Sequence, residues 1–402
     1  YEFYDPIRKT PIHPWHVKHN AVFEDVGQWK RPWYFKKFEN ETMHDAVQRE
    51  SKQVRESAGI LDGSTLGKLE IKGKDALEFV NLMYTNSFTK MRPNTARYAL
   101  MLGEDGMVKD DGIVCKINDQ HFITTTTTGG AANVLAHMEE YAQTEWPDMN
   151  VYINSITEQF STFNISGPKA KVIMGRVFSN IDFSNEEFPY MTFKSFDYLK
   201  TKIRILRASF TGEQGYEIYV SPKHALTLWE RIFYYSRDLV LVPYGTETMH
   251  LLRAEKGYII VGQETDGTVT PTDLNLNWMI GKAKKDFIGK RSLTRSDIIS
   301  SERKQLVGLV PLNKAYGIEE GQHVIEENNL DTPIKKPVKM LGHVTSSYFS
   351  PTLNHCFAMA LIKGGNRKIG SHLYVSTSDL NVIPVEVVKP NFIDPENERL
   401  VS

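Results

Sequence analysis

A hairpin pattern near residue 100 constrains the fold of this chain more than any other stretch. Tyr98–Leu102 predicts a strand, Gly103–Gly106 a tight turn with two glycines, and Ile113–Ile117 the returning strand. Side chains alternate between the two faces of a strand, so the adjacent Asp110 and Asp111 should point in opposite directions. We therefore expect one carboxylate to reach the interior or a cleft. The alternative is that both flank the turn in solvent.

Size and charge narrow the functional classes. The chain has 402 residues, of which 41% are hydrophobic, enough to bury a large core in about two or three domains. Its 48 basic and 49 acidic residues leave a net charge of −1, so no excess positive field exists to attract nucleic acid. A run of about 18 apolar residues, which a membrane helix needs, does not occur. We expect neither nucleic acid nor a membrane as a partner.

The cysteines and the N-terminal residues indicate the cellular compartment and whether the chain is part of a longer protein. Cys115 and Cys356 are the only cysteines and form no CxxC pattern, which favours a reducing compartment and a cytoplasmic protein. The first residues include no initiator methionine and no basic segment followed by an apolar one. We expect the chain to be a piece of something longer or a processed product.

Residues 1–40 predict an N-terminal arm. This segment is rich in proline, tryptophan, histidine and tyrosine, so we expect an irregular arm that packs on another surface. His13, His16 and His19 suggest a zinc site, but Pro14 should break the helix that would align them. We therefore expect surface or packing histidines and no metal.

The remaining chain predicts an α+β region at 41–298 and a small C-terminal β-barrel at 299–402. Helices are predicted at 43–58, 75–84, 131–143, from Pro168, at 223–238 and at 245–257, and further strands at 67–73, 121–128, 203–210 and 216–220. The barrel strands are predicted at 306–312, 342–348, 356–362, 372–376 and 382–388, after a polar linker near 295–304.

Two stretches of the α+β region invite a functional interpretation. Thr124–Thr128 precedes Gly129-Gly130 and predicts either a strand with one solvated face or a strand end whose hydroxyls and amides meet a ligand. Glu217 stands in an apolar strand directly after a glycine-bounded turn, which is also the setting of Asp111. Polar positions in alternating strands usually face solvent, so a solvated Glu217 is the alternative.

Missing motifs exclude several enzyme classes. The sequence has no GxGxxG after a strand, no GxxxxGK[ST], no HExxH and no GxSxG. A self-contained dinucleotide enzyme, nucleotide hydrolase, zincin or serine hydrolase is therefore disfavoured. The residues alone support a multi-domain α+β protein with candidate carboxylates at Asp111 and Glu217.

Four motifs in order resemble the folate-binding T-protein (aminomethyltransferase) family of the glycine cleavage system. They are Tyr98, Met101-Leu102, Gly106 and Asp110-Asp111, then Ser166-Gly167-Pro168, then Thr211 to Glu217, and then Leu252 to Gly257. A closer resemblance covers nearly the whole chain and is to the C-terminal half of the α subunits of heterotetrameric sarcosine oxidases. The strings that carry it are Trp15 to Gly27, Thr124 to Gly130, Tyr244 to His250, Gly262 to Gly267 and Gly342 to Tyr348.

The resemblance implies a fold and a set of site residues. The expected fold has two interleaved α+β subdomains and a C-terminal barrel, with a tetrahydrofolate site between the two subdomains. The family's main catalytic carboxylate falls on Asp111, and the glutamate that grips the pterin falls on Glu217. The other cofactor-binding positions implied are Tyr98, Thr128, Gly129 and Phe210.

The resemblance also implies an activity. A flavin elsewhere in the assembly would oxidise the N-methyl group of sarcosine, and tetrahydrofolate bound by this chain would capture the carbon as 5,10-methylenetetrahydrofolate. The whole enzyme would carry FMN, FAD and NAD, mostly outside this chain, and would include β, γ and δ subunits. The alternatives are a stand-alone folate-dependent aminomethyltransferase or demethylase, and a non-catalytic folate-binding module.

Two positions depart from the T-protein pattern. Met249 replaces an arginine, and Phe210 replaces the tyrosine before the Thr-Gly turn. The first change disfavours transfer from a lipoyl-bound carrier, and the second removes a hydroxyl from the pocket. Both favour the oxidase interpretation.

Overall fold

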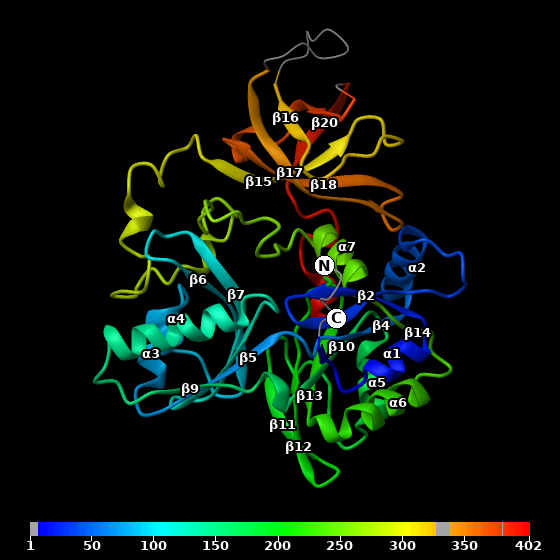
Figure 1. Cartoon of the computed structure of the whole chain (residues 1–402), viewed down its shortest axis with the longest axis vertical. Helices are drawn as coiled ribbons and strands as arrows, with labels where there is room; N and C mark the ends of the chain where they lie inside the picture. Colours follow the sequence, from blue (N-terminus) through cyan, green and yellow to red (C-terminus); the bar gives the residue numbers. More distant parts are fainter. Residues whose placement is uncertain (1–6, 327–337, 380) are drawn as a thin grey trace. The chain divides into compact units, whose positions relative to one another are not determined.

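The computed structural model describes residues 7–326, 338–379 and 381–402, which form two compact units (Figure 1). Among the described residues, the first unit contains 7–99, 110–252 and 396–402, and the second contains 100–109, 253–326, 338–379 and 381–395. Residues 1–6 of the expected N-terminal arm lie outside the described residues. In the described ranges, none of the helices is both long and apolar enough to cross a bilayer.

A six-stranded sheet in the first unit has the order β11-β12-β13-β10-β4-β14. Its strands are β4 (Ala58–Asp62), β10 (Ser161–Ser166), β11 (Phe193–Tyr198), β12 (Thr201–Leu206), β13 (Gly215–Val220) and β14 (Leu241–Pro243). All neighbours are antiparallel except β14, which runs parallel to β4.

Helices cover both faces of this sheet. Ile60 of β4 lies in the core formed with α5 (Ala170–Val177) and α6 (Ala225–Tyr235), whereas Leu61 packs with residues of α2 (Met43–Glu56) and α7 (Thr246–Lys256). A strand buried on both faces needs continuous apolar residues rather than alternating ones, which explains the sequence of β4. Gly59 is required there because a Cβ would lie 2.5 Å from Val54 Cγ2 and 2.6 Å from Tyr244 Cδ1.

A five-stranded sheet with the order β6-β7-β8-β5-β9 comes from the sequence between β4 and β10. Its strands are β5 (Gly67–Lys72), β6 (Thr95–Leu102), β7 (Val108–Asn118), β8 (His121–Thr126) and β9 (Tyr152–Ser155). Helices α3 (Ala76–Met83) and α4 (Ala131–Thr144) contact it. Because this sheet is inserted into the sequence of the six-stranded one, the expected interleaving of two α+β subdomains is confirmed.

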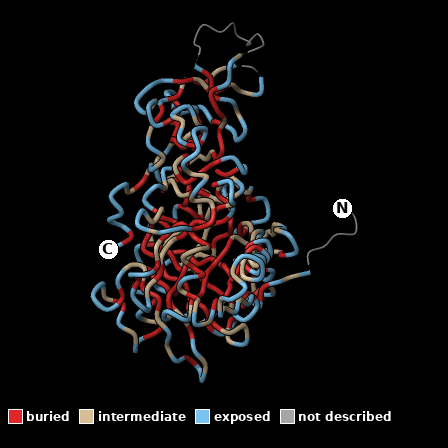
Figure 2. The backbone as a smooth tube through the Cα atoms, turned by 90° about the vertical axis from the view of Figure 1, so that its left-hand side faces the viewer, coloured by how far each residue is buried: buried red, intermediate tan, exposed pale blue. Residues whose placement is uncertain are grey.

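One apolar cluster joins the two sheets. It contains Ala96, Cys115 and Ile123 of the five-stranded sheet and Phe193, Leu206 and Tyr219 of the six-stranded sheet, together with Ile156 and Ala208. We call this set the intersheet layer. Figure 2 shows the buried backbone running through the interior of the unit, with the exposed stretches at its loops.

The N-terminal segment is more regular than we expected. It forms β1 (Arg8–Lys9), α1 (His13–Lys18), β2 (Ala21–Val26) and β3 (Trp29–Phe35), and the strands make a sheet of order β1-β3-β2. Pro14 lies in the first turn of α1, where its missing N–H is not needed, so it begins the helix instead of breaking it. The expected packing is confirmed, because the Trp15 ring centroid lies 5.2 Å from that of Trp229.

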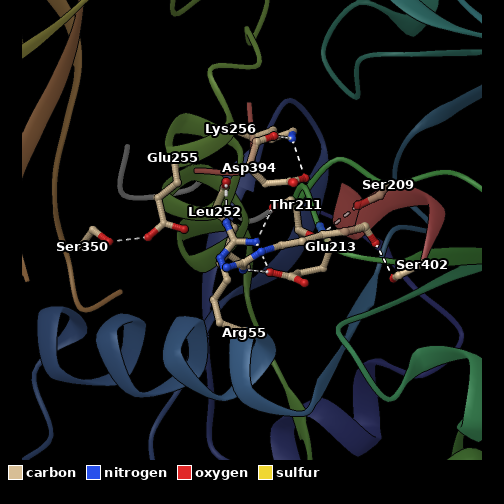
Figure 3. Close-up of polar contacts among 11 residues, drawn as sticks. Arg55, Ser209, Thr211, Glu213, Leu252, Glu255, Lys256, Ser350, Asp394 and Ser402 are labelled. Carbon is tan, nitrogen blue, oxygen red and sulfur yellow. Dashed lines mark hydrogen bonds and ion pairs between the residues drawn. The ribbon is translucent and has the colours of Figure 1, made fainter. Parts of the chain in front are cut away.

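The second unit is dominated by a closed barrel of order β15-β18-β17-β16-β19-β20. Its strands are β15 (Lys304–Pro311), β16 (His323–Ile325), β17 (Met340–Ser350), β18 (His355–Lys363), β19 (His372–Ser376) and β20 (Val382–Val388). At the end of α7, Ser350 donates a 2.5 Å bond to Glu255, and Lys256 pairs with Asp394 at 2.9 Å (Figure 3).

Most predicted elements are present. The helices predicted at 43–58, 75–84, 131–143, 223–238 and 245–257 all occur with bounds within three residues, and so do the five predicted barrel strands. The sequence analysis missed β4, β9, β11, β14 and β16. The short helices are η1 (Thr157–Gln159), η2 (Pro222–His224), η3 (Asn277–Met279), η4 (Ser292–Thr294), η5 (Gly365–Lys368) and α8 (Glu398–Val401).

The pair His16–Asp62 should be a main anchor of the N-terminal segment. His16 Nε2 lies 2.9 Å from Asp62 Oδ2, and both side chains are almost fully buried. Replacing His16→Phe would leave a buried carboxylate without this partner, so the free energy of unfolding should fall by about 3 kcal/mol in urea denaturation. The control is His19→Phe at the exposed C-cap position of the same helix, where we expect a change of about 0.5 kcal/mol or less. Equal effects of the two substitutions would contradict this role.

Candidate functional site

Tyr98 and Asp111 meet on neighbouring strands of the predicted hairpin. The Tyr98 hydroxyl donates a 2.5 Å hydrogen bond to Asp111 Oδ2, and both residues are half-buried. The turn forms as predicted, since the Gly106 N–H bonds the Gly103 carbonyl at 3.0 Å and Gly106 has a φ of +84° that favours glycine. The structure therefore brings together the expected catalytic residue and one expected binding residue.

Asp110 occupies the opposite face of β7 and is only 3% exposed. Its Oδ1 accepts the backbone N–H of Asp111 at 2.8 Å, and its Oδ2 is buried without a hydrogen-bond partner among the described residues. The expectation that one of the two aspartates reaches the interior is confirmed. Because Asp110 is buried and Asp111 is half-buried, the alternative in which both flank the turn in solvent is wrong.

The surroundings of Asp111 favour its protonated form. Burial raises the pKa of Asp111 to about 7; the Tyr98 hydrogen bond opposes this increase, and the negative charge of Asp110 adds to it. A carboxyl group with a pKa near 7 exchanges protons readily at neutral pH, so Asp111 is suited to general acid and base chemistry.

Glu217 lies within β13, whose residues are all buried, and is 8% exposed. Its cross-strand neighbour on β10 is Asn164, whose Nδ2 donates a 3.0 Å bond to Glu217 Oε1. The Tyr219 hydroxyl donates a 2.7 Å bond to Glu217 Oε2. The alternative of a solvated Glu217 is wrong, because helices and the second sheet cover this strand.

A buried lysine contributes charge near Glu217. Burial raises the pKa of Glu217, whereas the Tyr219 bond, the charge of Lys68 and the Asn164 bond lower it. Lys68 belongs to β5, and its Nζ donates to the carbonyls of Ser64 at 3.0 Å and Leu66 at 2.7 Å. Burial in turn lowers the pKa of Lys68 to about 8.

Asp111 and Glu217 border the same intersheet layer. Residues two apart on a strand share a face, so Asp111 follows the face of Ile113 and Cys115, and Glu217 follows that of Tyr219. Cys115 and Tyr219 belong to the layer, and Ile113 packs against it. Burial and then the charge of Glu217 raise the pKa of the Cys115 thiol. The two carboxylates thus project from facing sheets.

The turn before Glu217 is fixed by a buried arginine (Figure 3). Arg55 of α2 donates 2.8 Å bonds to the Thr211 carbonyl and to Glu213 Oε1, and a 3.1 Å bond to the Leu252 carbonyl. Arg399 donates a second charged bond to Glu213, at 2.6 Å. These bonds set where β13 begins and therefore where Glu217 lies.

The other expected binding residues all lie in loops. The Thr128 hydroxyl is 3.1 Å from that of Thr65 and accepts a 3.4 Å contact from Arg31. Gly129 is exposed just before α4, and Phe210 is half-buried in the loop between β12 and β13.

The threonine run matches neither expectation fully. Thr124, Thr125 and Thr126 are all buried, so the strand has no solvated face. Their hydroxyls serve the fold instead: Thr124 lies 2.8 Å from the Tyr84 hydroxyl, and Thr125 Oγ1 accepts the N–H of Ile113 at 2.9 Å. Only the last residues of the run remain available for a ligand.

Metal ligation finds no support within the residues that the structure describes. No cluster there holds three or more histidine, cysteine, aspartate or glutamate side chains in a metal-binding arrangement. His16 instead pairs with Asp62, and the His19 ring stacks on Trp15 with centroids 3.6 Å apart.

Sequence reasoning missed three polar residues that support Glu217: Asn164, Tyr219 and Lys68. Tyr219 could have been found from its i+2 spacing to Glu217 on one strand. Asn164 and Lys68 required the pairing of strands distant in sequence, which no local pattern indicates.

Two family models match the chain. The model described as the GCVT N-terminal domain covers residues 12–284, and the glycine cleavage T-protein C-terminal barrel domain covers residues 304–394. A crystal structure of the glycine cleavage system aminomethyltransferase T from Bartonella henselae matches with a TM-score of 0.82 at 22% identity, over 96% of this chain and 98% of that one. This structure supports the fold assignment.

Curated relatives fall into two groups. The sarcosine oxidase α subunit of Corynebacterium sp. strain U-96 is 45% identical over 99% of this chain, and that of Rhizobium meliloti strain 1021 is 37% identical over 99%. The chain spans about two fifths of those subunits, 41% and 40% of their length. An aminomethyltransferase of Caldanaerobacter subterraneus subsp. tengcongensis is 30% identical over 92% of both proteins.

The closed barrel and the interleaved sheets agree with these matches. The chain therefore belongs to the glycine cleavage T-protein family of enzymes, together with the aminomethyltransferases and the corresponding part of the sarcosine oxidase α subunits.

Proposed function

We propose that this chain is the tetrahydrofolate-binding part of a sarcosine oxidase and captures the one-carbon unit of an oxidised N-methyl amine as 5,10-methylenetetrahydrofolate. The observation that carries the proposal is the buried carboxylate of Glu217, which shares its strand face with Tyr219 of the intersheet layer, just as Asp111 shares its face with Cys115 of that layer. One carboxylate would hold the pterin, and the other would serve the reacting nitrogen atoms.

The surroundings of Glu217 fit a pterin. Each carboxylate oxygen has two lone pairs, and Oε1 and Oε2 each accept one bond from the protein, from Asn164 and Tyr219. One lone pair on each oxygen therefore remains for the two parallel donors of a pterin, the 2-amino group and the N3 hydrogen. Such a two-point, charge-assisted arrangement is both strong and specific. We assign further contacts with the cofactor to Tyr98, Thr128, Gly129 and Phe210.

Asp111 would manage the protons of the transfer. The methylene carbon moves from the amine nitrogen of oxidised sarcosine to N5 and N10 of tetrahydrofolate, and glycine leaves with the two protons that those nitrogens lose. Asp111 in its ionised form accepts a proton from the attacking nitrogen, stabilises positive charge on the amine, and returns the proton to the departing glycine. Tyr98 keeps the carboxylate oriented through its 2.5 Å bond.

The oxidase assignment rests on similarity along the whole chain. The oxidase subunits are 45% and 37% identical, compared with 30% for the aminomethyltransferase. We assign the flavin chemistry (FMN, FAD) and the NAD site to the remainder of the assembly, with β, γ and δ subunits as partners and a cytoplasmic location. The sequence has no dinucleotide motif that would place those groups in this chain.

A stand-alone aminomethyltransferase is the second candidate, because the chain spans 92% of one such relative. Met249 separates the two candidates. It packs against the cluster of Val54, Leu61, Tyr244 and Leu252 and supplies no positive charge where T-proteins are expected to carry an arginine. This position favours the oxidase.

Glu217→Ala should weaken tetrahydrofolate binding to the purified chain by more than about tenfold. This factor corresponds to about 1.4 kcal/mol, the scale of one hydrogen bond to a charged group. Calorimetric titration under argon measures the affinity, which we expect to be micromolar for the unaltered chain. Asp111→Asn is the matched control and should bind within about threefold of it. The absence of both heat and thermal protection at millimolar folate would contradict the proposal.

Asp111→Asn should instead remove the transfer step. In the enzyme reconstituted with its partner subunits, the yield of methylenetetrahydrofolate should drop by about 10²-fold, and formaldehyde should replace it. Because the pKa of Asp111 is raised to about 7 and the ionised form is the base, the folate-dependent rate should rise with pH and level off above about 7. Quenched-flow assays from pH 5.5 to 8.5 test this dependence. A profile independent of pH, or full transfer by Asp111→Asn, would exclude Asp111 as the base.

A further inference from the structure

We infer that Asn164 and Tyr219 are positioning residues for pterin recognition: each donates one hydrogen bond to one oxygen of Glu217 and so leaves the outer lone pairs of the carboxylate ordered for the ligand. This inference rests on the proposed function and adds the groups on which the specificity of Glu217 depends. Neither residue needs to touch the pterin itself.

The position of Asn164 is determined by sheet pairing. It is the register partner of Glu217 on β10, and its Nδ2 lies 3.0 Å from Glu217 Oε1. The amide nitrogen must face the carboxylate, because an ionised carboxylate has no proton to donate. Asn164 Oδ1 is buried and accepts no hydrogen bond from the described residues. The amide group therefore uses its donor side, toward the carboxylate of Glu217.

A glycine makes room for this amide. A Cβ on residue 63 would lie only 2.7 Å from Asn164 Oδ1, so Gly63 permits the close approach of the side chain to the end of β4. The orientation of Asn164 therefore depends on backbone packing as well as on Glu217.

Tyr219 holds the other oxygen through a rigid ring. The side chain is 3% exposed, and its ring makes edge contacts with Phe193 and Phe160, with centroids 6.0 and 6.5 Å away. This packing directs the hydroxyl to Glu217 Oε2 at 2.7 Å. Both donors stabilise the ionised form of Glu217, which is the form that accepts two bonds from a pterin.

The groups near Glu217 change their charge little between pH 5 and 8, so a change in the ionisation of Glu217 itself can be measured. The titratable groups that interact with it are Tyr219 on its own strand, Lys68 on β5, Cys115 on β7, Tyr190 and Tyr244. The pKa values of the thiol and the three tyrosines are all raised by burial, so these groups stay neutral between pH 5 and 8. Lys68, with a pKa of about 8, is positive over most of this range. Loss of a donor should therefore show as a change in the pH at which Glu217 ionises.

The test is the dissociation constant of tetrahydrofolate between pH 5 and 8, measured by calorimetry with the full chain. Protonation of Glu217 should weaken binding at low pH. In Tyr219→Phe and Asn164→Leu we expect this weakening to begin about one pH unit higher than in the unaltered chain. Binding should then be up to about tenfold weaker at low pH and within about threefold of normal at pH 8. Asn164→Asp should move this onset further, because a second carboxylate beside Glu217 disfavours ionisation.

Tyr216→Phe is the matched control. Tyr216 precedes Glu217 on β13, faces the opposite side, is fully buried, and its hydroxyl has no hydrogen-bond partner in the described part of the chain. Its substitution should leave the profile unchanged. Thermal melting identifies any variant that fails to fold, and the conclusion then depends on the remaining two variants.

An unchanged profile in Tyr219→Phe and both Asn164 variants would overturn the inference while leaving the proposed function intact, provided that Glu217→Ala abolishes tight binding. A chain that binds no folate, or a Glu217→Ala variant that binds normally, would overturn both. A shift of equal size in Tyr216→Phe would also overturn the inference, because loss of any buried hydroxyl from the strand would then suffice.

Discussion

Removing two carboxylates from water is the constraint that the first unit has to satisfy. An ionised carboxylate is costly to bury unless donors surround it. Glu217 receives donors from Asn164 and Tyr219 and lies near the charge of Lys68, whereas Asp111 receives one bond from Tyr98 and lies beside a second carboxylate. Their environments therefore differ in kind. Around Glu217, two donors and a lysine oppose the burial that raises its pKa, whereas around Asp111 burial and a second negative charge raise the pKa to about 7 against a single hydrogen bond.

The fold supplies this environment by facing one sheet against another. Alternation along β7 and β13 directs Asp111 and Glu217 to the same intersheet layer, and Arg55 fixes the turn from which β13 starts. Interleaving brings this about, because the five-stranded sheet is inserted in sequence between β4 and β10 of the other. A substitution at Arg55 would thus affect the position of Glu217 without touching any ligand.

Local patterns predicted the parts of this fold that depend on local physics. The hairpin followed from Gly103 and Gly106, α2 from its cap, where Thr42 Oγ1 accepts the Asp45 N–H at 3.2 Å, and the barrel from short strands between turn residues. The prediction of an irregular N-terminal arm was wrong, because a helix tolerates a proline in its first turn and α1 has Pro14 there. Strand β4 was missed because burial on both faces removes the alternation that marks a strand.

The candidate site could be predicted only in part. Asp111 and Glu217 attracted attention as carboxylates after glycine turns, but their burial depends on strands and helices distant in sequence. The roles of Tyr98, Thr128, Gly129 and Phe210 came from family resemblance, and of these Tyr98 contacts a candidate carboxylate directly. Asn164 could not be predicted from local sequence patterns, because only the register between β10 and β13 identifies it as the neighbour of Glu217.

The most direct test of this account is a crystal structure of the chain with tetrahydrofolate bound under argon. The account predicts the 2-amino group and N3 of the pterin within about 3.2 Å of the two Glu217 oxygens, with the reacting nitrogen atoms on the side of Asp111. Density for the pterin away from Glu217, or with its reacting nitrogens turned away from Asp111, would contradict the assignment of one carboxylate to binding and the other to proton transfer.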